Sequence, residues 1–403
     1  MGSAPKSAQA VVSWARWIAI GVFVLSSSLN YLDRLLLAAL APTIKTEFQL
    51  SNTQYGEIIS VFSIVYALAA PLAGWFVDRV GLNAGIYVAM SVWSLAGAAT
   101  GFTTSLPGLL ACRTVLGIGE AGGIPCTGKA NGLYLASREL ALGTALNQVG
   151  ITIGSVAAPL LVAALAPAYG WRYTFVLTGA LGFVWILVWW AVSRRIPPGV
   201  QASAAPRLPV RDILRDRRLW GLIAANALVM TLYTLWTNWT TVYLVQELHL
   251  SAIDANRRFA WIPPVFATAG GFFGGWMAFR AIRGGGDVFA SRMRVCWVAA
   301  VFLLATALVP LAASPVTAVG AISLSFFWCL AISTNLYAMP IDWFGAGRAA
   351  FSVSAITCSF GLMTAVISPA IGAVVDRFGF APVCVAMAAL PLAGIAVLRL
   401  SAR

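Results

Sequence analysis

Charged residues are scarce in this sequence, and their scarcity excludes a soluble globular protein. Only 10% of the 403 residues are Asp, Glu, Lys or Arg, whereas a soluble domain carries about 25%. Hydrophobic residues make up 60% of the chain, and the mean hydropathy is +0.86. No polar stretch is long enough to form a soluble domain. The composition therefore predicts a membrane protein.

Metal-binding and catalytic patterns are missing as well. The chain has one histidine, and its six cysteines lie in apolar stretches without the spacing of a metal site. Gly117, Gly119 and Gly122 match a dinucleotide-binding pattern, but no strand precedes them, so we set that interpretation aside. Because no nucleophile–base or metal constellation is present, we expect neither an enzyme nor a metal or organic cofactor.

Long apolar runs dominate the chain instead. A membrane-spanning helix needs roughly 20 apolar residues, and the expected spans are 14–41, 54–78, 84–104, 107–135, 139–168, 171–193, 219–246, 258–281, 290–312, 315–340, 349–375 and 379–400. The first run is full length and contains charges, so it is not a cleavable signal peptide. The predicted fold is an all-α polytopic membrane protein with 12 transmembrane helices in two six-helix bundles.

The two halves of the sequence resemble each other. Pro159 and Pro369 are each followed by a glycine-containing turn, YGWR at 169–172 and RFGF at 377–380. Paired six-span repeats are a common layout of secondary transporters. The segment between the halves is rich in Pro, Ala and Arg. The expected domains are an N-terminal bundle at 1–193, a cytoplasmic linker at 194–218 and a C-terminal bundle at 219–403.

The net charge of +13 is explained by membrane orientation rather than by nucleic-acid binding. If the N-terminus is cytoplasmic, most Lys and Arg residues fall on the inner side. Those that fall outside are Lys45, Arg172, Arg257, Arg258 and Arg377. This bias is the positive-inside signature, which places both termini in the cytoplasm. We expect the lipid bilayer as a partner and no nucleic acid.

Three charges interrupt the apolar stretch from Leu109 to Lys129. Arg113 and Glu120 are nearly two helical turns apart, so they share one helix face, about 10 Å apart along its axis. A charge inside a membrane costs several kcal/mol and is tolerated mainly in a bundle interior or a wet cavity. The pattern indicates a transporter whose N-terminal half carries the charges. Lys129 is either a substrate contact or a side chain that reaches the cytoplasmic interface.

A second pair of charges lies in the first span, in NYLDR at 30–34. Asp33 and Arg34 point about 100° apart on a helix, so they need not pair with each other. Protonation of a buried carboxyl depends on the charges beside it, which makes Asp33 and Glu120 candidate proton carriers. The alternative is a static network, Asp33 with Arg113 or Glu120 with Arg34, that only holds the first and fourth spans together.

Several motifs occur in a recognisable order: NYLDR (30–34), FSIVYALAAPLAGWFVDRVG (62–81), RTVLGIGEAGGIP (113–125), GWRYTFVLTGALGF (170–183), FFGGW (272–276) and STNLYAMPIDWF (333–344). Together they resemble the anion:cation symporter family within the major facilitator superfamily, in particular its bacterial hexuronate and sugar-acid branch. The resemblance implies proton-driven import of an organic anion by alternating access. It also implies a location in the bacterial inner membrane.

The resemblance assigns roles to individual residues. The family's coupling carboxylates correspond to Asp33 and Glu120, so protons are the expected coupling ions. Its cationic positions match Arg34 and Arg113, and its second-span tyrosine matches Tyr66. We expect these three residues to bind substrate.

The loop after the second span contains Asp78 and Arg79, at the place of the superfamily's loop motif. That motif normally ends with basic residues, which Leu82 and Asn83 replace here. We expect a gating role for Asp78 and Arg79, with simple helix capping as the alternative.

The C-terminal half is apolar for a protein that binds many sugar hydroxyls. Cys329 to Ile332 stand where the sugar-acid branch tends to carry polar or aromatic groups. Because unpaired buried polar groups are costly, we expect a small monocarboxylate as substrate, with a sugar acid as the open alternative. The remaining expected substrate contacts are Gln148, Trp239 and Asn335.

Two other functions fit parts of the pattern. Spinster-like lipid transporters and drug transporters suit an apolar C-terminal half, and spinster-type carriers share NYxDR-like and GEA-like motifs. A transporter-derived receptor would bind without flux. Our expectation is a symporter for a small organic anion that acts as a monomer.

Overall fold

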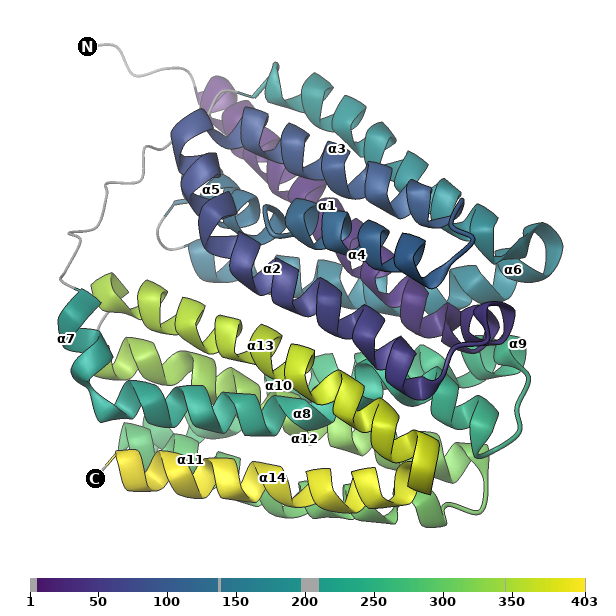
Figure 1. Ribbon diagram of the computed structural model, residues 1–403. Helices are drawn as coiled ribbons and strands as arrows, with labels where there is room; N and C mark the ends of the chain where they lie inside the picture. Colours follow the sequence, from purple (N-terminus) through teal and green to yellow (C-terminus); the bar gives the residue numbers. More distant parts are fainter. Residues whose placement is uncertain (1–5, 137–138, 197–209, 345, 403) are drawn as a thin grey trace. The chain divides into compact units, whose positions relative to one another are not determined.

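The computed structural model describes residues 6–136, 139–196, 210–344 and 346–402, and every regular element in these ranges is a helix (Figure 1). The first half contains α1 (Lys6–Phe48), α2 (Asn52–Val80), α3 (Leu82–Thr100), α4 (Leu106–Glu120), α5 (Gly123–Tyr134) and α6 (Leu140–Ser193). The second half contains α7 (Val210–Arg215), α8 (Arg217–Gln246), α9 (Ala252–Asp254), the π-helix η2 (Ala255–Ala260), α10 (Ile262–Arg283), α11 (Val288–Leu303), the 3-10 helix η3 (Leu304–Leu311), α12 (Pro315–Phe344), α13 (Ala346–Phe378) and α14 (Phe380–Ser401).

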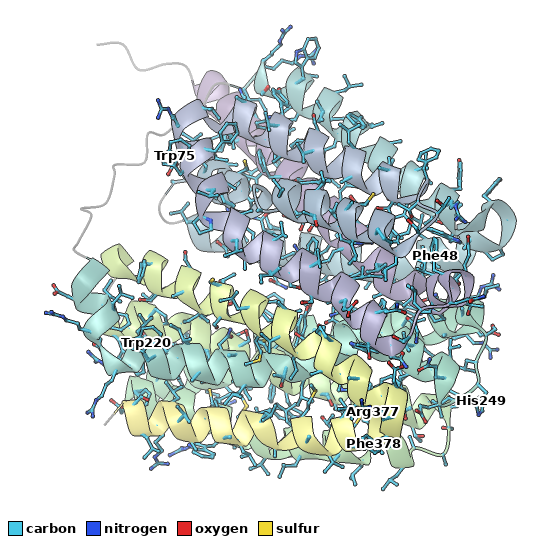
Figure 2. All side chains as sticks on the ribbon, in the orientation of Figure 1. Phe48, Trp75, Trp220, His249, Arg377 and Phe378 are labelled. Carbon is cyan, nitrogen blue, oxygen red and sulfur yellow. The ribbon has the colours of Figure 1, made fainter. Side chains whose placement is uncertain are left out.

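Within the described residues, nine helical stretches are long and apolar enough to cross a membrane. α6 counts once among them although it covers two expected spans, and α4 and α5 are too short to count separately. The expectation of an all-α membrane protein is therefore confirmed for this part of the chain. The single histidine, His249, is exposed in the turn after α8 (Figure 2).

The expected fourth span, 107–135, is not one continuous helix. α4 ends at Glu120 and α5 begins at Gly123 after a short turn. Each glycine lowers helix stability by about 1 kcal/mol relative to alanine. A Cβ atom at Gly119 would lie 2.6 Å from the backbone nitrogen of Trp93. The glycines that let α3 approach this closely also weaken the helix, and Pro125 in the first turn of α5 is a residue at which a kink in this span is expected.

α6 folds back on itself at Gly170. Its backbone there has φ 80° and ψ 160°, outside the helical region. A Cβ atom at Gly150 would lie 2.5 Å from the carbonyl oxygen of Val24, and Trp185 Nε1 donates to the carbonyl of Val22, 2.7 Å away. In a straight helix, residues 150 and 185 would be about 50 Å apart. Both contact the same turn of α1, so the chain must reverse between them.

The chain forms two compact units by its internal contacts. The N unit comprises Met1–Leu37 and Val65–Ser203, and the C unit comprises Ala38–Ile64 and Ala204–Arg403. The division after Ser203 falls inside the expected linker, 194–218. The end of α1 and the start of α2 belong to the C unit by their contacts.

The interior of the N unit is built around α3, which packs against α4 and α6. At one end of this core, the ring of Phe23 lies edge-on to Trp189, with 4.8 Å between centroids, and Trp185 and Tyr134 complete the cluster. Trp189 Nε1 donates to Asn83 Oδ1, 3.1 Å away. The indole N–H groups of both tryptophans are thus hydrogen-bonded inside an apolar core.

In the C unit, α8 packs against α12, α13 and α14, and α10 packs against α12. The α10–α12 contact is close because α10 presents glycines. A Cβ atom at Gly270 would lie 1.9 Å from the carbonyl oxygen of Phe327, and one at Gly274 would lie 2.5 Å from that of Ala331. Small residues of this kind allow two membrane helices to approach at backbone distance.

The two halves also share an unusual backbone feature. Glycines with positive φ occur at the turn after α2 (Gly81, 87°), inside α6 (Gly170, 80°), after α10 (Gly285, 88°) and after α13 (Gly379, 72°). Side chains other than glycine rarely adopt this conformation. Gly170 and Gly379 lie in the YGWR and RFGF turns that suggested an internal repeat. The repeated turns therefore have the same backbone conformation.

We predict that Gly154→Val destabilises the protein, because a Cβ atom there would lie 2.1 Å from the carbonyl oxygen of Ser28 on α1. Overpacking typically costs about 1–3 kcal/mol, so the midpoint of thermal unfolding should fall. Gly21→Ala is the matched control, since nothing lies within 4 Å of its Cβ position. An unchanged midpoint for Gly154→Val would contradict the close packing of α1 on α6.

Candidate functional site

Four charged residues gather inside the N unit. α1 supplies Asp33 and Arg34, and α4 supplies Arg113 and Glu120. Asp33, Arg113 and Glu120 are 4%, 2% and 1% exposed, so all three are buried. The side chain of Arg34 is 22% exposed. The arginine and the glutamate share one face of α4, as their spacing predicted.

Arg34 and Glu120 form an ion pair. Glu120 Oε2 accepts hydrogen bonds from Arg34 Nη2, 2.8 Å away, and from Arg34 Nε, 3.1 Å away. The charge-assisted bonds compensate the cost of burying both charges. The glutamate–arginine half of the static network considered above is therefore present.

Two tyrosines hold the Arg34 guanidinium from its faces. Its central carbon lies 4.8 Å from the ring centroid of Tyr66 and 5.1 Å from that of Tyr31. Cations are attracted to aromatic faces at such distances. Tyr66 was expected at this site, whereas Tyr31 was missed. Its position three residues before Arg34, on the same helix face, is the signal that indicates it.

Asp33 has different surroundings. The charges of Glu120 and Arg113 act on its carboxylate, and the hydroxyl of Thr178 on α6 lies beside it. Arg113 itself lies over the ring of Phe175, 5.7 Å from the centroid. The two arginines thus have separate positions, one paired with Glu120 and the other near Asp33.

Polar atoms of this cluster are buried with few hydrogen bonds inside the described chain. Asp33 Oδ1 has none, whereas Glu120 Oε1 and Asn30 Nδ2 are buried close enough to bond to each other. Buried polar groups in proteins are normally hydrogen-bonded, so exceptions need an explanation. A carboxylate oxygen in this situation is able to take a proton or to accept a hydrogen bond from a bound molecule. The cluster therefore has the chemistry of a proton and ligand site.

Lys129, on α5, directs its side chain to the C-terminal end of α2 and is not part of the cluster of four charges. Its Nζ donates to the carbonyl of Val77, 2.8 Å away, and pairs with Asp78 Oδ1 at 3.3 Å. A cation at a helix C-terminus complements the helix dipole. Arg79 lies over the ring of Trp75, 5.5 Å from its centroid. The structure thus brings Lys129 and Asp78 together.

The other expected substrate contacts lie apart. Gln148 is exposed on α6 of the N unit. Trp239, in the C unit, is fully buried between the rings of Tyr55 and Phe380, at 5.0 and 6.2 Å. Asn335 is fully buried on α12. Its amide donates to two backbone carbonyls, of Gly274 and Ala331.

An ion pair that the sequence did not indicate lies next to Asn335. Arg292 Nε donates to Asp342 Oδ2, 2.6 Å away, and Arg292 Nη1 reaches Asn335 Oδ1 at 3.5 Å. The pair joins α11 to α12 and holds the asparagine side chain from its oxygen. Both the amide nitrogen and the amide oxygen of Asn335 thus have partners within the C unit.

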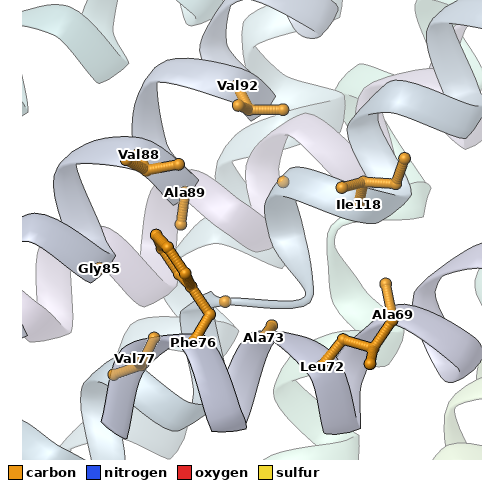
Figure 3. A pocket seen from close by; sticks show the side chains of 12 residues that line it. Ala69, Leu72, Ala73, Phe76, Val77, Gly85, Val88, Ala89, Val92 and Ile118 are labelled. Carbon is orange, nitrogen blue, oxygen red and sulfur yellow. The ribbon is translucent and has the colours of Figure 1, made fainter. Parts of the chain in front are cut away.

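A metal site does not accompany the N-unit charges in the described residues, and a groove in the same unit is apolar. No group of three or more His, Cys, Asp and Glu side chains that would hold a metal occurs in the ranges described. A groove of about 410 Å³ between α2, α3 and α4 is lined by apolar residues such as Leu72, Val88 and Ile118 (Figure 3). It contains none of the expected site residues.

Comparisons with known proteins agree with the resemblance inferred from the motifs. A family model described as Major Facilitator Superfamily matches residues 23–339. The Hexuronate transporter of Escherichia coli (strain K12) is 28% identical, covering 95% of this chain and 93% of the relative. The Galacturonate transporter of Dickeya chrysanthemi is 30% identical, covering 65% and 81%. The expected kinship with sugar-acid transporters is confirmed, and these relatives are transporters rather than enzymes.

A solved structure has the same fold. It is a bacterial homolog of the human lysosomal transporter Spinster, in an inward-facing and occupied conformation. The match has a TM-score of 0.79 and 20% sequence identity, and it covers 100% of this chain and 98% of the other. At this identity the similarity establishes the fold and not the substrate.

We predict that Arg34→Ala lowers the thermal unfolding midpoint more than Glu120→Gln does. Removing the arginine leaves the Glu120 charge buried without its ion-pair partner, which typically costs about 3–5 kcal/mol. Asp78→Asn is the control, because Asp78 is 77% exposed and such pairs contribute at most about 1 kcal/mol. Equal shifts for Arg34→Ala and Asp78→Asn would contradict the buried pair.

Proposed function

This chain belongs to the Major Facilitator Superfamily, and we propose that it is a proton-coupled symporter that imports an organic anion by alternating access. It acts as a monomer in the bacterial inner membrane with both termini in the cytoplasm. The excess of Lys and Arg in the expected inner segments supports this orientation.

We propose twelve membrane spans in two six-helix bundles, at 1–193 and 219–403 with a linker at 194–218. Nine stretches qualify by length and hydropathy. α6 supplies two spans because it reverses direction at Gly170. The broken pair α4–α5 supplies another, and α10, with 22 residues, is long enough to cross the hydrocarbon core of a membrane.

The observation that carries the proposed mechanism is the cluster of two carboxylates and two arginines buried in the N unit. With all four groups charged, their charges cancel. Protonation of one carboxylate leaves one positive charge in excess, which attracts an anion. Binding of a proton and binding of an anion therefore favour each other, and this reciprocity is what coupled transport requires.

The two carboxylates have different parts in this mechanism. Asp33 is the first proton carrier, because Glu120 is already held by two hydrogen bonds from Arg34. Arg113 attracts the substrate carboxylate, with Arg34 and Tyr66 next to it. Without substrate and proton, the Arg34–Glu120 pair keeps the cluster neutral. That resting state resists leakage of protons.

The remaining expected contacts keep their proposed roles. Gln148 is a proposed substrate contact in the N unit, and Trp239 and Asn335 are proposed substrate contacts in the C unit. Asp78 and Arg79 contribute to a cytoplasmic gate, in which Lys129 holds Asp78 at the end of α2. For Lys129 this position favours the gate over contact with the substrate.

Two classes of organic anion are candidates for the substrate. The names of the relatives, hexuronate and galacturonate transporters, favour a sugar acid. The apolar residues before Ser333 favour a smaller carboxylate with fewer hydroxyls. A spinster-like lipid or drug transporter is the alternative function, supported by the similar fold of the Spinster homolog.

We predict that proteoliposomes containing the protein acidify inside when one chemical group of carboxylates is added outside. An internal pH dye would report proton entry with lactate and pyruvate, dicarboxylates, aromatic acids, hexuronates and aldonates. Acidification by hexuronates would identify a sugar-acid symporter, and acidification by lactate or pyruvate a monocarboxylate symporter. No acidification with any of them would contradict the organic-anion proposal and favour the lipid or drug transporter.

We predict that Asp33→Asn abolishes proton-driven accumulation of the substrate found in that assay but leaves exchange across the membrane. Asparagine keeps the shape of the side chain and removes its ability to carry a proton. Asp254→Asn is the control, because Asp254 bonds only within its own turn at Ser251. If Asp33→Asn still concentrates substrate against a gradient, the assignment of Asp33 is wrong.

A further inference from the structure

The N-terminus of α2 is capped by a residue from a distant helix. Asp376 of α13 accepts hydrogen bonds from the backbone nitrogens of Asn52 and Thr53, each 2.9 Å away, and from the Thr53 hydroxyl at 2.7 Å. All three residues belong to the C unit. The first N–H groups of a helix have no partner inside it, and a carboxylate also complements the helix dipole. Ser51 Oγ caps the next free amide, of Gln54.

The end of α1 is tied to the same cap. Lys45 is only 8% exposed and donates to the side chain of Asn52. Asp376 attracts the Lys45 charge as well. A pocket of about 390 Å³ adjoins these groups and is lined by further polar residues, including Gln49 and Gln246. Water therefore has access to the polar contacts at this end of the α2–α13 contact, which we call the seam.

Below the cap, α2 and α13 approach each other at backbone distance. A Cβ atom at Gly56 would lie 2.3 Å from the carbonyl oxygen of Ser368, and one at Gly372 would lie 2.2 Å from that of Asn52. Ser60 Oγ donates to the carbonyl of Ala365, 2.6 Å away. The contacts described here are between backbone, glycine and small hydroxyl groups, and such contacts are able to separate without exchanging large side chains.

We propose that Asp376 is the gating residue of the outer face, holding α2 against α13 while the transporter is closed to the outside and releasing α2 when the outer face opens to admit substrate. The proposal rests on the proposed function, because α2 and α13 belong to different halves of the sequence and alternating access separates the halves on one side at a time. The cap suits this role since water replaces its hydrogen bonds when the seam opens. The glycine contacts allow close backbone packing in the closed seam. The hydrogen bonds to the Asp376 carboxylate stabilise the closed seam and break when it opens.

Cysteine labelling tests the proposal without a substrate. Ser368 is fully buried and its hydroxyl bonds only within its own helix, so Ser368→Cys places a thiol inside the closed seam. The full chain carrying this change, in lipid nanodiscs, would be treated with a charged maleimide. Adding Asp376→Ala should raise the labelling rate about fivefold to thirtyfold, the factor that corresponds to 1–2 kcal/mol for a lost helix cap. Asp376→Asn should raise it less, because asparagine also caps helices.

Native Cys296 is the internal control, because it is fully buried on α11. It should stay unlabelled in every variant, and Asp254→Ala should leave the labelling rate of the introduced thiol unchanged. A rate at the introduced thiol that Asp376→Ala does not raise would overturn the proposal. If Asp376→Ala exposes Cys296 as well, the variant has disturbed the fold, and Thr53→Ala is used in its place. Thr53→Ala removes only the hydrogen bond from the Thr53 hydroxyl to Asp376. A severalfold rise with Cys296 protected then supports the gate, and no rise contradicts it.

The outcome is separable from that of the proposed function. Faster labelling together with no proton entry for any carboxylate would leave the gate in place and reject the symporter. Proton entry without any change in labelling would support the symporter and reject the gate.

Discussion

A charge buried in a membrane helix needs a compensating partner, and the arrangement of the N unit depends on that requirement. Glu120 meets it through Arg34, whose guanidinium also lies between two tyrosine rings. Once this pair is made, α1 and α4 have a defined rotation relative to each other. Asp33 points about 100° away from Arg34 around α1, and its carboxylate lies beside Thr178 of α6 and near Arg113 and Glu120. The two buried carboxylates of the cluster thus differ, because Glu120 is engaged by Arg34 whereas Asp33 is the one that we propose carries the proton.

Much of this cluster was predictable from the sequence because burying charge is so costly. Asp33, Arg34, Arg113 and Glu120 stand out in apolar spans for that reason, and helical spacing placed the last two on one face. The spans themselves follow from hydropathy. The choice of partners was left open by the sequence, since it depends on how far each helix is rotated and on side-chain conformations that periodicity does not record.

Other features escaped prediction for different physical reasons. The break after Glu120 lies where glycines contact α3, and the close approach of that helix is not visible in the sequence. The sequence left Lys129 between a substrate contact and the cytoplasmic interface, and its partners are at the end of α2. The cap on Asn52 comes from a residue 324 positions away, and no local pattern indicates it. Trp239 and Asn335 were expected as substrate contacts, and the structure shows how fully each is packed within the C unit. Contacts between distant segments are thus the part of the site that a single sequence does not contain.

The reversal of α6 at one glycine has a consequence for biosynthesis. Its two arms are joined by a turn that contains a single non-helical residue, Gly170, so no polar loop exists to be translocated between them. The connection between the two arms is too short for one arm to cross the bilayer while the other stays away from the membrane in water. We therefore expect the two arms to leave the insertion machinery together, as one helical hairpin. The positive-φ glycine before α14, Gly379, creates the same condition for the last pair of helices.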